Sequence, residues 1–134
     1  MRGLPVGRCI SLPCGPNGLR IRMTEESGRL ATALVQRYRD RFGRGPTEAR
    51  AVIQDDFALV ILASAQTDVE RSLVAGGELD SVEVLRRRVR QMAASEFCAV
   101  TEEIVGRKVT AMLGDHNAVA NVTVLVFLLE PQDP

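Results

Sequence analysis

The side chains with the clearest capacity for chemistry stand in two polar stretches of this 134-residue chain. Asp55 and Asp56 adjoin in one stretch, and Asp115 adjoins His116, the only histidine, in the other. Carboxylates with one imidazole can bind a hard divalent cation or a cationic ligand. Aspartate is also a common turn residue, which explains the same positions without any ligand. The four residues are therefore a candidate ligand or metal site, with ordinary turn chemistry as the alternative.

Enzyme chemistry has little support in the sequence. Serine–histidine and cysteine–histidine catalysis both require a histidine, and only His116 could serve. Cys98 follows Phe97 on an apolar-leaning segment, so we expect a packed and inert thiol. The chain has no Walker loop, no dinucleotide fingerprint and no nucleophile elbow. We therefore expect a protein that is not an enzyme, with no catalytic residues and no cofactor.

Composition indicates a folded cytoplasmic protein. The hydrophobic fraction is 46% and the charged fraction is 25%, which is typical of a globular domain. Seventeen basic and seventeen acidic residues cancel, so nothing general favours nucleic acid as a partner. Three cysteines without framework spacing indicate a reducing compartment. No apolar stretch approaches the roughly 20 residues that span a membrane, so we expect no direct membrane insertion.

Glycine and proline divide the chain into two parts. Residues 1–22 are dense in these breakers, which predicts a flexible N-terminal arm. The arm could belong to the native protein or result from an upstream start codon. Residues 23–134 are the right length for a single domain.

Hydrophobic periodicity predicts the elements of that domain. Residues 25–42 repeat apolar side chains at helical spacing, and residues 67–75 and 80–105 predict two further helices. Residues 48–54 and 57–63 predict one hairpin, and residues 108–113 and 121–130 predict another across a turn at 114–117. The expected fold is α+β, in the order α-β-β-α-α-β-β. It has a four-stranded antiparallel sheet covered on one face by helices.

The predicted order also suggests where the two hairpin turns lie. If the two intervening helices form an up-and-down pair, the chain returns to its starting end before the second hairpin. Both turns would then lie at one end of the sheet. This arrangement would bring Asp55 and Asp56 close to Asp115 and His116.

Two of the predicted strands are apolar on both faces, which points to an interaction surface. An antiparallel sheet that is open to water on one face normally alternates apolar and polar residues. We therefore expect a homodimer formed through one apolar face, with Leu125, Phe127 and Leu129 at its centre. A different protein, an apolar ligand or a wider wrap of helices would also cover that face.

A basic run marks the early turns of the long predicted helix. It consists of Arg86, Arg87, Arg88 and Arg90. A solvated helix face is the ordinary interpretation of such a run, and a docking patch for an acidic partner is the functional one.

A series of positions in order resembles the MpsC-like family, named for a component of a sodium-translocating, membrane-potential-generating system. The series comprises residues 43–47, Asp56, Thr67 with Glu70 and Leu73, Val84 with Arg87, residues 106–109, Asp115 and residues 127–129. The likeness covers about residues 28–130. It implies an accessory or regulatory subunit associated with membrane cation or bicarbonate transport, possible contact with a transporter subunit, and no catalytic residues. A dimeric small-molecule or ion-binding sensor domain is the alternative.

One departure from the family pattern bears on the candidate metal site. Family members often carry an acidic residue just before the last strand, where this chain has residues 118–121 without one. The resemblance therefore supplies no acidic ligand set.

Overall fold

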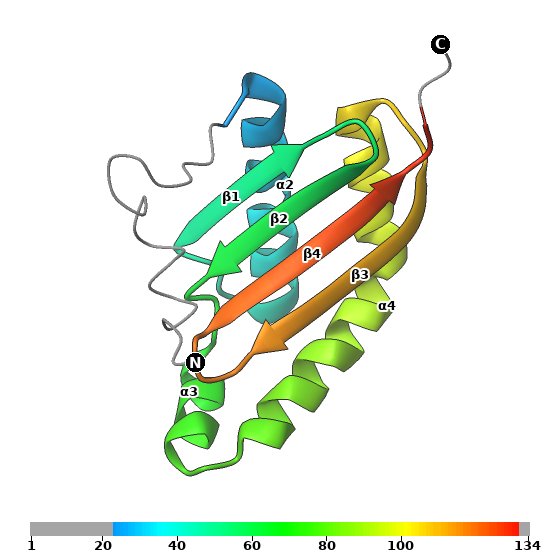
Figure 1. The fold of residues 1–134 in the computed structure, drawn as a ribbon. Helices are drawn as coiled ribbons and strands as arrows, with labels where there is room; N and C mark the ends of the chain where they lie inside the picture. The colour runs from blue at the N-terminus through cyan, green and yellow to red at the C-terminus, as the bar shows by residue number, and fades with distance from the viewer. Residues whose placement is uncertain (1–22, 132–134) are drawn as a thin grey trace, which may run out of the picture.

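The computed structural model describes residues 23–131, so the predicted arm at 1–22 lies outside the described residues. The elements are α2 (Glu25–Phe42), β1 (Glu48–Ile53), β2 (Phe57–Ala63), α3 (Asp68–Ala75), α4 (Leu79–Val105), β3 (Val109–Asn117) and β4 (Val122–Leu129). This order confirms the predicted α-β-β-α-α-β-β arrangement and the α+β class. Figure 1 shows α2 and α4 behind a twisted sheet.

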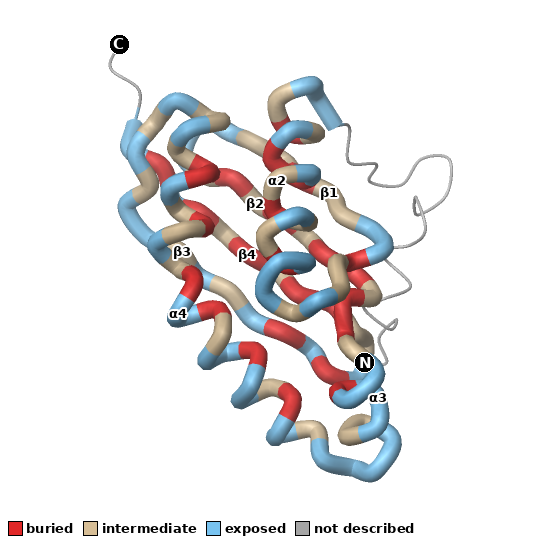
Figure 2. The backbone as a smooth tube through the Cα atoms, turned by 180° about the vertical axis from the view of Figure 1, so that it is seen from behind, coloured by how far each residue is buried: buried red, intermediate tan, exposed pale blue. Residues whose placement is uncertain are grey.

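The four strands form an antiparallel sheet in the order β1-β2-β4-β3. The strands of each hairpin pair with each other, and β2 pairs with β4 in the middle of the sheet. Helices α2 and α4 lie on the same face, as Figures 1 and 2 both show. The other face carries no helix among the described residues.

The core lies between the two helices and the covered face of the sheet. Apolar side chains from α2, α4 and the strands form one cluster, and buried residues line the inner sides of these elements in Figure 2. Tyr38 stacks between Phe42 and Phe97, at ring-centroid distances of 5.8 and 5.2 Å. The four-residue apolar spacing of α2 therefore serves packing, as periodicity predicted.

The helices begin and end for local chemical reasons. Thr24 and Thr67 form capping boxes at the starts of α2 and α3, the latter with Glu70. Gly43 and Gly106 end α2 and α4 in the left-handed region, at φ 79° and 78°. These signals confirm the predicted ends of α2, the start of α3 and the end of α4, whereas Glu78 before α4 forms no side-chain cap.

The expectation that both hairpin turns lie at one end of the sheet is wrong. The β1–β2 turn lies beside the end of β4, where the amide of Leu129 donates to the carbonyl of Asp56. The other turn lies beside the end of β2, where the amide of Ser64 donates to the carbonyl of Asn121. Helix α3 has 8 residues and α4 has 27, which correspond to about 12 and 40 Å. Only α4 spans the sheet, so the chain crosses once and the turns lie at opposite ends.

Strand β3 is longer than predicted. Residues 114–117 belong to β3, and the turn comprises residues 118–121. Asn117 stabilises this turn by accepting the amide of Ala120, and Asn121 adopts a left-handed φ of 58°. The sequence prediction took the polar residues of the strand for the turn itself.

The sheet face predicted for self-association is the covered face. Leu125, Phe127 and Leu129 are buried at 0%, 0% and 4% exposure and belong to the core cluster. Because side chains alternate along a strand, the opposite face of β4 carries Val124, Val126 and Leu128. Both sides of this strand are apolar, so periodicity alone did not say which one the helices cover.

Candidate functional site

The structure separates the four residues of the candidate metal site into two distant pairs. Asp55 and Asp56 lie at the β1–β2 turn, where the Arg107 guanidinium donates to the carbonyls of Gln54 and Asp55. Asp115 and His116 lie toward the opposite end of the sheet, beside Val124 and Thr123 of β4. Across the described residues, no group of three or more His, Cys, Asp or Glu side chains is arranged to hold a metal ion. The prediction that these four residues lie close together is therefore wrong.

The basic run of α4 is divided between two environments. Arg87 and Arg88 are exposed, whereas Arg86 and Arg90 are 2% and 8% exposed. Positions 86 and 90 lie one helical turn apart on the inner face of α4. The run is therefore not one docking patch, and only its outer two arginines face solvent.

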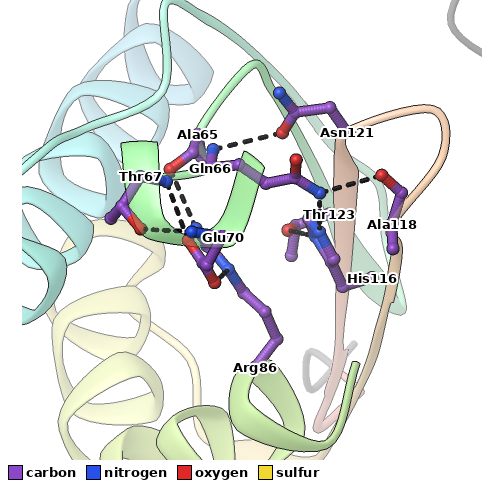
Figure 3. Close-up of polar contacts among 9 residues, drawn as sticks. All are labelled: Ala65, Gln66, Thr67, Glu70, Arg86, His116, Ala118, Asn121 and Thr123. Carbon is purple, nitrogen blue, oxygen red and sulfur yellow. Dashed lines mark hydrogen bonds and ion pairs between the residues drawn. The ribbon is translucent and has the colours of Figure 1, made fainter. Parts of the chain in front are cut away.

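A buried ion pair joins α3 to α4 (Figure 3). The Arg86 Nε donates to Glu70 Oε2 at 2.7 Å, and the Arg86 Nη2 donates to Glu70 Oε1 at 2.6 Å. The same Nη2 donates to the carbonyl of Ala65 at 2.8 Å. Glu70 also accepts the Thr67 amide at 2.8 Å, so one carboxylate caps α3 and holds α4. Bidentate geometry of this kind is what guanidinium and carboxylate favour.

The remaining side of the Arg86 guanidinium faces an aromatic ring. Its central carbon lies 3.9 Å from the ring centroid of Phe42. Its Nη1 is the one buried side-chain nitrogen or oxygen without a hydrogen-bond partner in the described part of the chain. The cation–π contact supplies part of the stabilisation that a hydrogen bond would give. The three described helices are thus linked by contacts among Phe42 of α2, Glu70 of α3 and Arg86 of α4.

His116 belongs to a second buried network, next to the ion pair in Figure 3. The Gln66 Nε2 donates to the Ala118 carbonyl at 2.9 Å and lies 3.0 Å from His116 Nε2. The His116 Nδ1 lies 2.7 Å from Thr123 Oγ1. Because the Gln66 amide nitrogen can only donate, Nε2 of the imidazole accepts and Nδ1–H donates to Thr123. His116 is therefore a neutral residue of the interior rather than a solvated turn residue.

Electrostatics agree with this neutral state. Burial, followed by the positive charge of Arg86, lowers the pKa of His116 from 6.5 to about 4. For Glu70, burial by itself raises the pKa, but the hydrogen bonds from Arg86 and Thr67 outweigh it and lower the pKa overall. Burial raises the pKa of Tyr38 to about 12. These shifts keep His116 and Tyr38 neutral and Glu70 ionised at neutral pH.

Two surfaces remain as candidates for binding. The first is a shallow groove on the outer side of α4, the α4 groove, lined by Asp80, Ser81, Val84, Leu85 and Arg88. Val84 and Leu85 are each 43% exposed, and Arg87 and Arg88 are exposed beside them. Along α4, Asp80 precedes the apolar pair and the two cations follow it, so the groove is suited to an amphipathic segment whose acidic residues lie beside Arg87 and Arg88.

The second surface is the uncovered side of the sheet, the open face. Ala58, Val60 and Leu62 of β2 are fully buried on the helix side. Strand alternation therefore places their neighbours on the open face, as it does in the other strands. Its apolar residues include Val52, Leu59, Ile61, Leu113, Val124 and Val126.

The buried pair and the histidine network were not anticipated from the sequence. Thr67 and Glu70 were identified as a capping box, which is correct but incomplete. A signal for Arg86 exists, because it lies four residues after Val82 and seven before Ala93, both buried on the inner stripe of α4. Gln66 and Thr123 carry no such signal, since only tertiary structure brings them to His116.

The comparisons with known proteins identify a family. A family model described as a Na+-translocating membrane potential-generating system (MpsC) matches residues 25–131. No curated protein and no solved structure matches the chain. The described part of the chain has no helix with the length and apolar character needed to cross a membrane. The family match confirms the resemblance inferred from the sequence.

Proposed function

The chain belongs to the MpsC family, and from this premise we propose that it is an accessory or regulatory subunit of a sodium-translocating, membrane-potential-generating system. In this role it has no catalytic activity of its own. It resides in the cytoplasm and reaches the membrane through a protein partner. The odd number of cysteines without framework spacing supports the reducing compartment.

The observation that carries the proposal is the α4 groove. Val84 and Leu85 expose apolar surface beside the cations of Arg87 and Arg88. The occupant we propose is an amphipathic segment of a membrane-system subunit, with apolar residues on Val84 and Leu85 and acidic residues on the two arginines. Apolar side chains provide the buried area of such an interface, and the charges fix its register.

Charge reversal of the two exposed arginines tests this docking surface. The double variant Arg87→Glu, Arg88→Glu should weaken binding to the partner about tenfold or more, because two attractive contacts become repulsive. The measurement is affinity capture from detergent-solubilised membranes, read by quantitative mass spectrometry, followed by titration of the captured subunit.

Arg29 and Arg39 of α2 provide the matched control, since both are exposed and the double reversal changes the net charge equally. The control variant should capture the subunit as wild type does. Recovery of no sodium-translocating subunit by the wild-type chain, or equal loss in both double variants, would contradict the proposal.

The open face supports a second part of the proposal, that the chain is a homodimer. A contiguous apolar sheet surface is unusual on a protein that acts as a monomer. The α4 groove lies on a different element, so one chain could pair through its sheet and bind the membrane partner through α4.

A further inference from the structure

We infer that two copies of the chain pair through their open faces about a twofold axis that runs parallel to the strands, between β2 and β4, and joins Arg50 of each copy to Asp115 of the other. This inference rests on the homodimer proposed above and adds its geometry. The strand register carries it, together with the placement of two opposite charges.

The register defines rows of residues that run straight across the open face. Arg50 pairs with Ile61, Ile61 with Val124, and Val124 with Asp115. One row therefore begins with a cation on β1, crosses two apolar residues and ends with an anion on β3. The next row contains Val52, Leu59, Val126 and Leu113 and is apolar throughout.

The two charged residues lie at the accessible edges of the sheet. Asp115 is exposed and Arg50 is partly exposed. Within one copy they are separated by three strand spacings, or about 14 Å, so they do not form an ion pair with each other. The apolar centre lies between them, as the core of an interface lies within a polar rim.

A twofold axis along the strands makes this row complementary to itself. Such an axis exchanges left and right edges and keeps each row at its own level along the strands. Arg50 then faces the partner's Asp115, the partner's Arg50 faces Asp115, and Ile61 faces the partner's Val124. Sheets that stack face to face lie about 10 Å apart, a gap that an extended arginine and an aspartate can bridge together.

The alternative twofold axis, perpendicular to the strands, does not have this property. It would place β1 on the partner's β1 and β3 on the partner's β3. On the β1 edge Arg50 could then meet only the partner's Glu48, which lies on the same face, and on the β3 edge Asp115 would meet no cation. Only the axis parallel to the strands gives Arg50 an anion and Asp115 a cation at the same time, so the charge pattern favours that axis.

Charge-swap variants of the full chain test the axis. Arg50→Asp and Asp115→Arg should each weaken the homodimer about tenfold, because both symmetric contacts become repulsive. Mixing these two variants should restore dimerisation as a heterodimer, since an aspartate at 50 of one copy meets an arginine at 115 of the other. The double variant Arg50→Asp, Asp115→Arg should form homodimers again. Sedimentation and native mass spectrometry would measure all four species.

Two further variants test whether the dimer forms through the open face, independently of the direction of the twofold axis. Leu113 and Val69 are both exposed, at 57% and 71%, on the open face and on α3 respectively. Leu113→Asp should abolish the dimer, and Val69→Asp should leave it intact. If Leu113→Asp acts as expected but the mixed charge variants do not recover, the chain dimerises through this face about a different axis and the inference fails. A wild-type chain that remains monomeric overturns both the inference and the homodimer, while the α4 docking proposal keeps its own test.

Discussion

At the scale of single residues, Arg86 shows how one side chain can join separate helices. It contacts Glu70 of α3, the Ala65 carbonyl and the ring of Phe42 from α2. A buried ion pair is not a large net source of stability, because desolvation offsets much of the attraction. Removing one partner, however, leaves a buried charge without compensation.

Arg86→Met should therefore destabilise the protein by about 3–5 kcal/mol, since Glu70 is left as an unpaired buried carboxylate. Adding Glu70→Gln removes that charge while keeping an oxygen for the Thr67 amide, so the double variant should recover part of the loss. Urea unfolding would measure the free energy of unfolding of the single and the double variant. Arg88→Met, two residues along the same helix and exposed, should change stability by less than about 0.5 kcal/mol. An equal loss in the single and double variants would show that the unpaired charge is not the cause.

At the scale of elements, Gly114 sets how closely α4 approaches β3. A Cβ at this position would lie 2.8 Å from Arg90 Cδ, 2.8 Å from Leu125 Cδ2 and 3.0 Å from the Val124 carbonyl oxygen. The side chain of Arg90 thus occupies the space that any other residue at 114 would need. The turn prediction for residues 114–117 failed here, because glycine serves close packing in the strand rather than a turn.

Gly114→Ala should destabilise the protein by about 1–3 kcal/mol, because the helix or the strand must shift to admit the methyl group. Thermal or urea unfolding would report the loss. Gly28 of α2 is the matched control, since a Cβ there meets nothing within 4 Å. Gly28→Ala should stabilise the protein by about 0.5–1 kcal/mol through a lower entropy of the unfolded chain. A Gly114→Ala variant with the same free energy of unfolding as the wild type would contradict the close packing of α4 against β3.

At the scale of the whole molecule, the polar groups buried around His116 and Glu70 make stability depend on pH. The pKa of His116 falls from 6.5 to about 4 in the folded state. A group whose folded pKa is depressed contributes its full stability above the unfolded pKa and loses it as pH falls toward the folded pKa. The unfolded chain binds a proton in that window and the folded chain does not, so acid favours unfolding.

The free energy of unfolding should therefore drop by about 2 kcal/mol between about pH 7 and pH 5. His116→Asn, which cannot take up this proton, should show a nearly flat profile over the same range. This window lies above 4.5, the ordinary pKa that Glu70 has before its environment lowers it, so the carboxylate stays ionised throughout. Urea unfolding across pH measures the slope, and parallel profiles for the two proteins would refute the assignment.

Local rules were sufficient for much of the fold. Thr24, Thr67, Gly43 and Gly106 act through neighbours a few residues away, so the sequence determined both ends of α2, the start of α3 and the end of α4. The apolar spacing of α2 and the unbroken apolar run of β2 determined the element types. Family membership could also be inferred from the sequence, because it depends on the order of residues along the chain.

The tertiary structure decided everything that depends on which distant segments meet. The lengths of α3 and α4 placed the two turns at opposite ends, which separated Asp55 from His116. Packing of α2 and α4 chose the Leu125 side of β4 as the core, although both sides of that strand are apolar. Strand register set Arg50 level with Asp115, and packing of α3 against α4 buried Arg86 against Glu70. The physical reason is that residues a few positions apart determine the local conformation of the backbone. The environment of a side chain, in contrast, is formed by segments that are far away in the sequence.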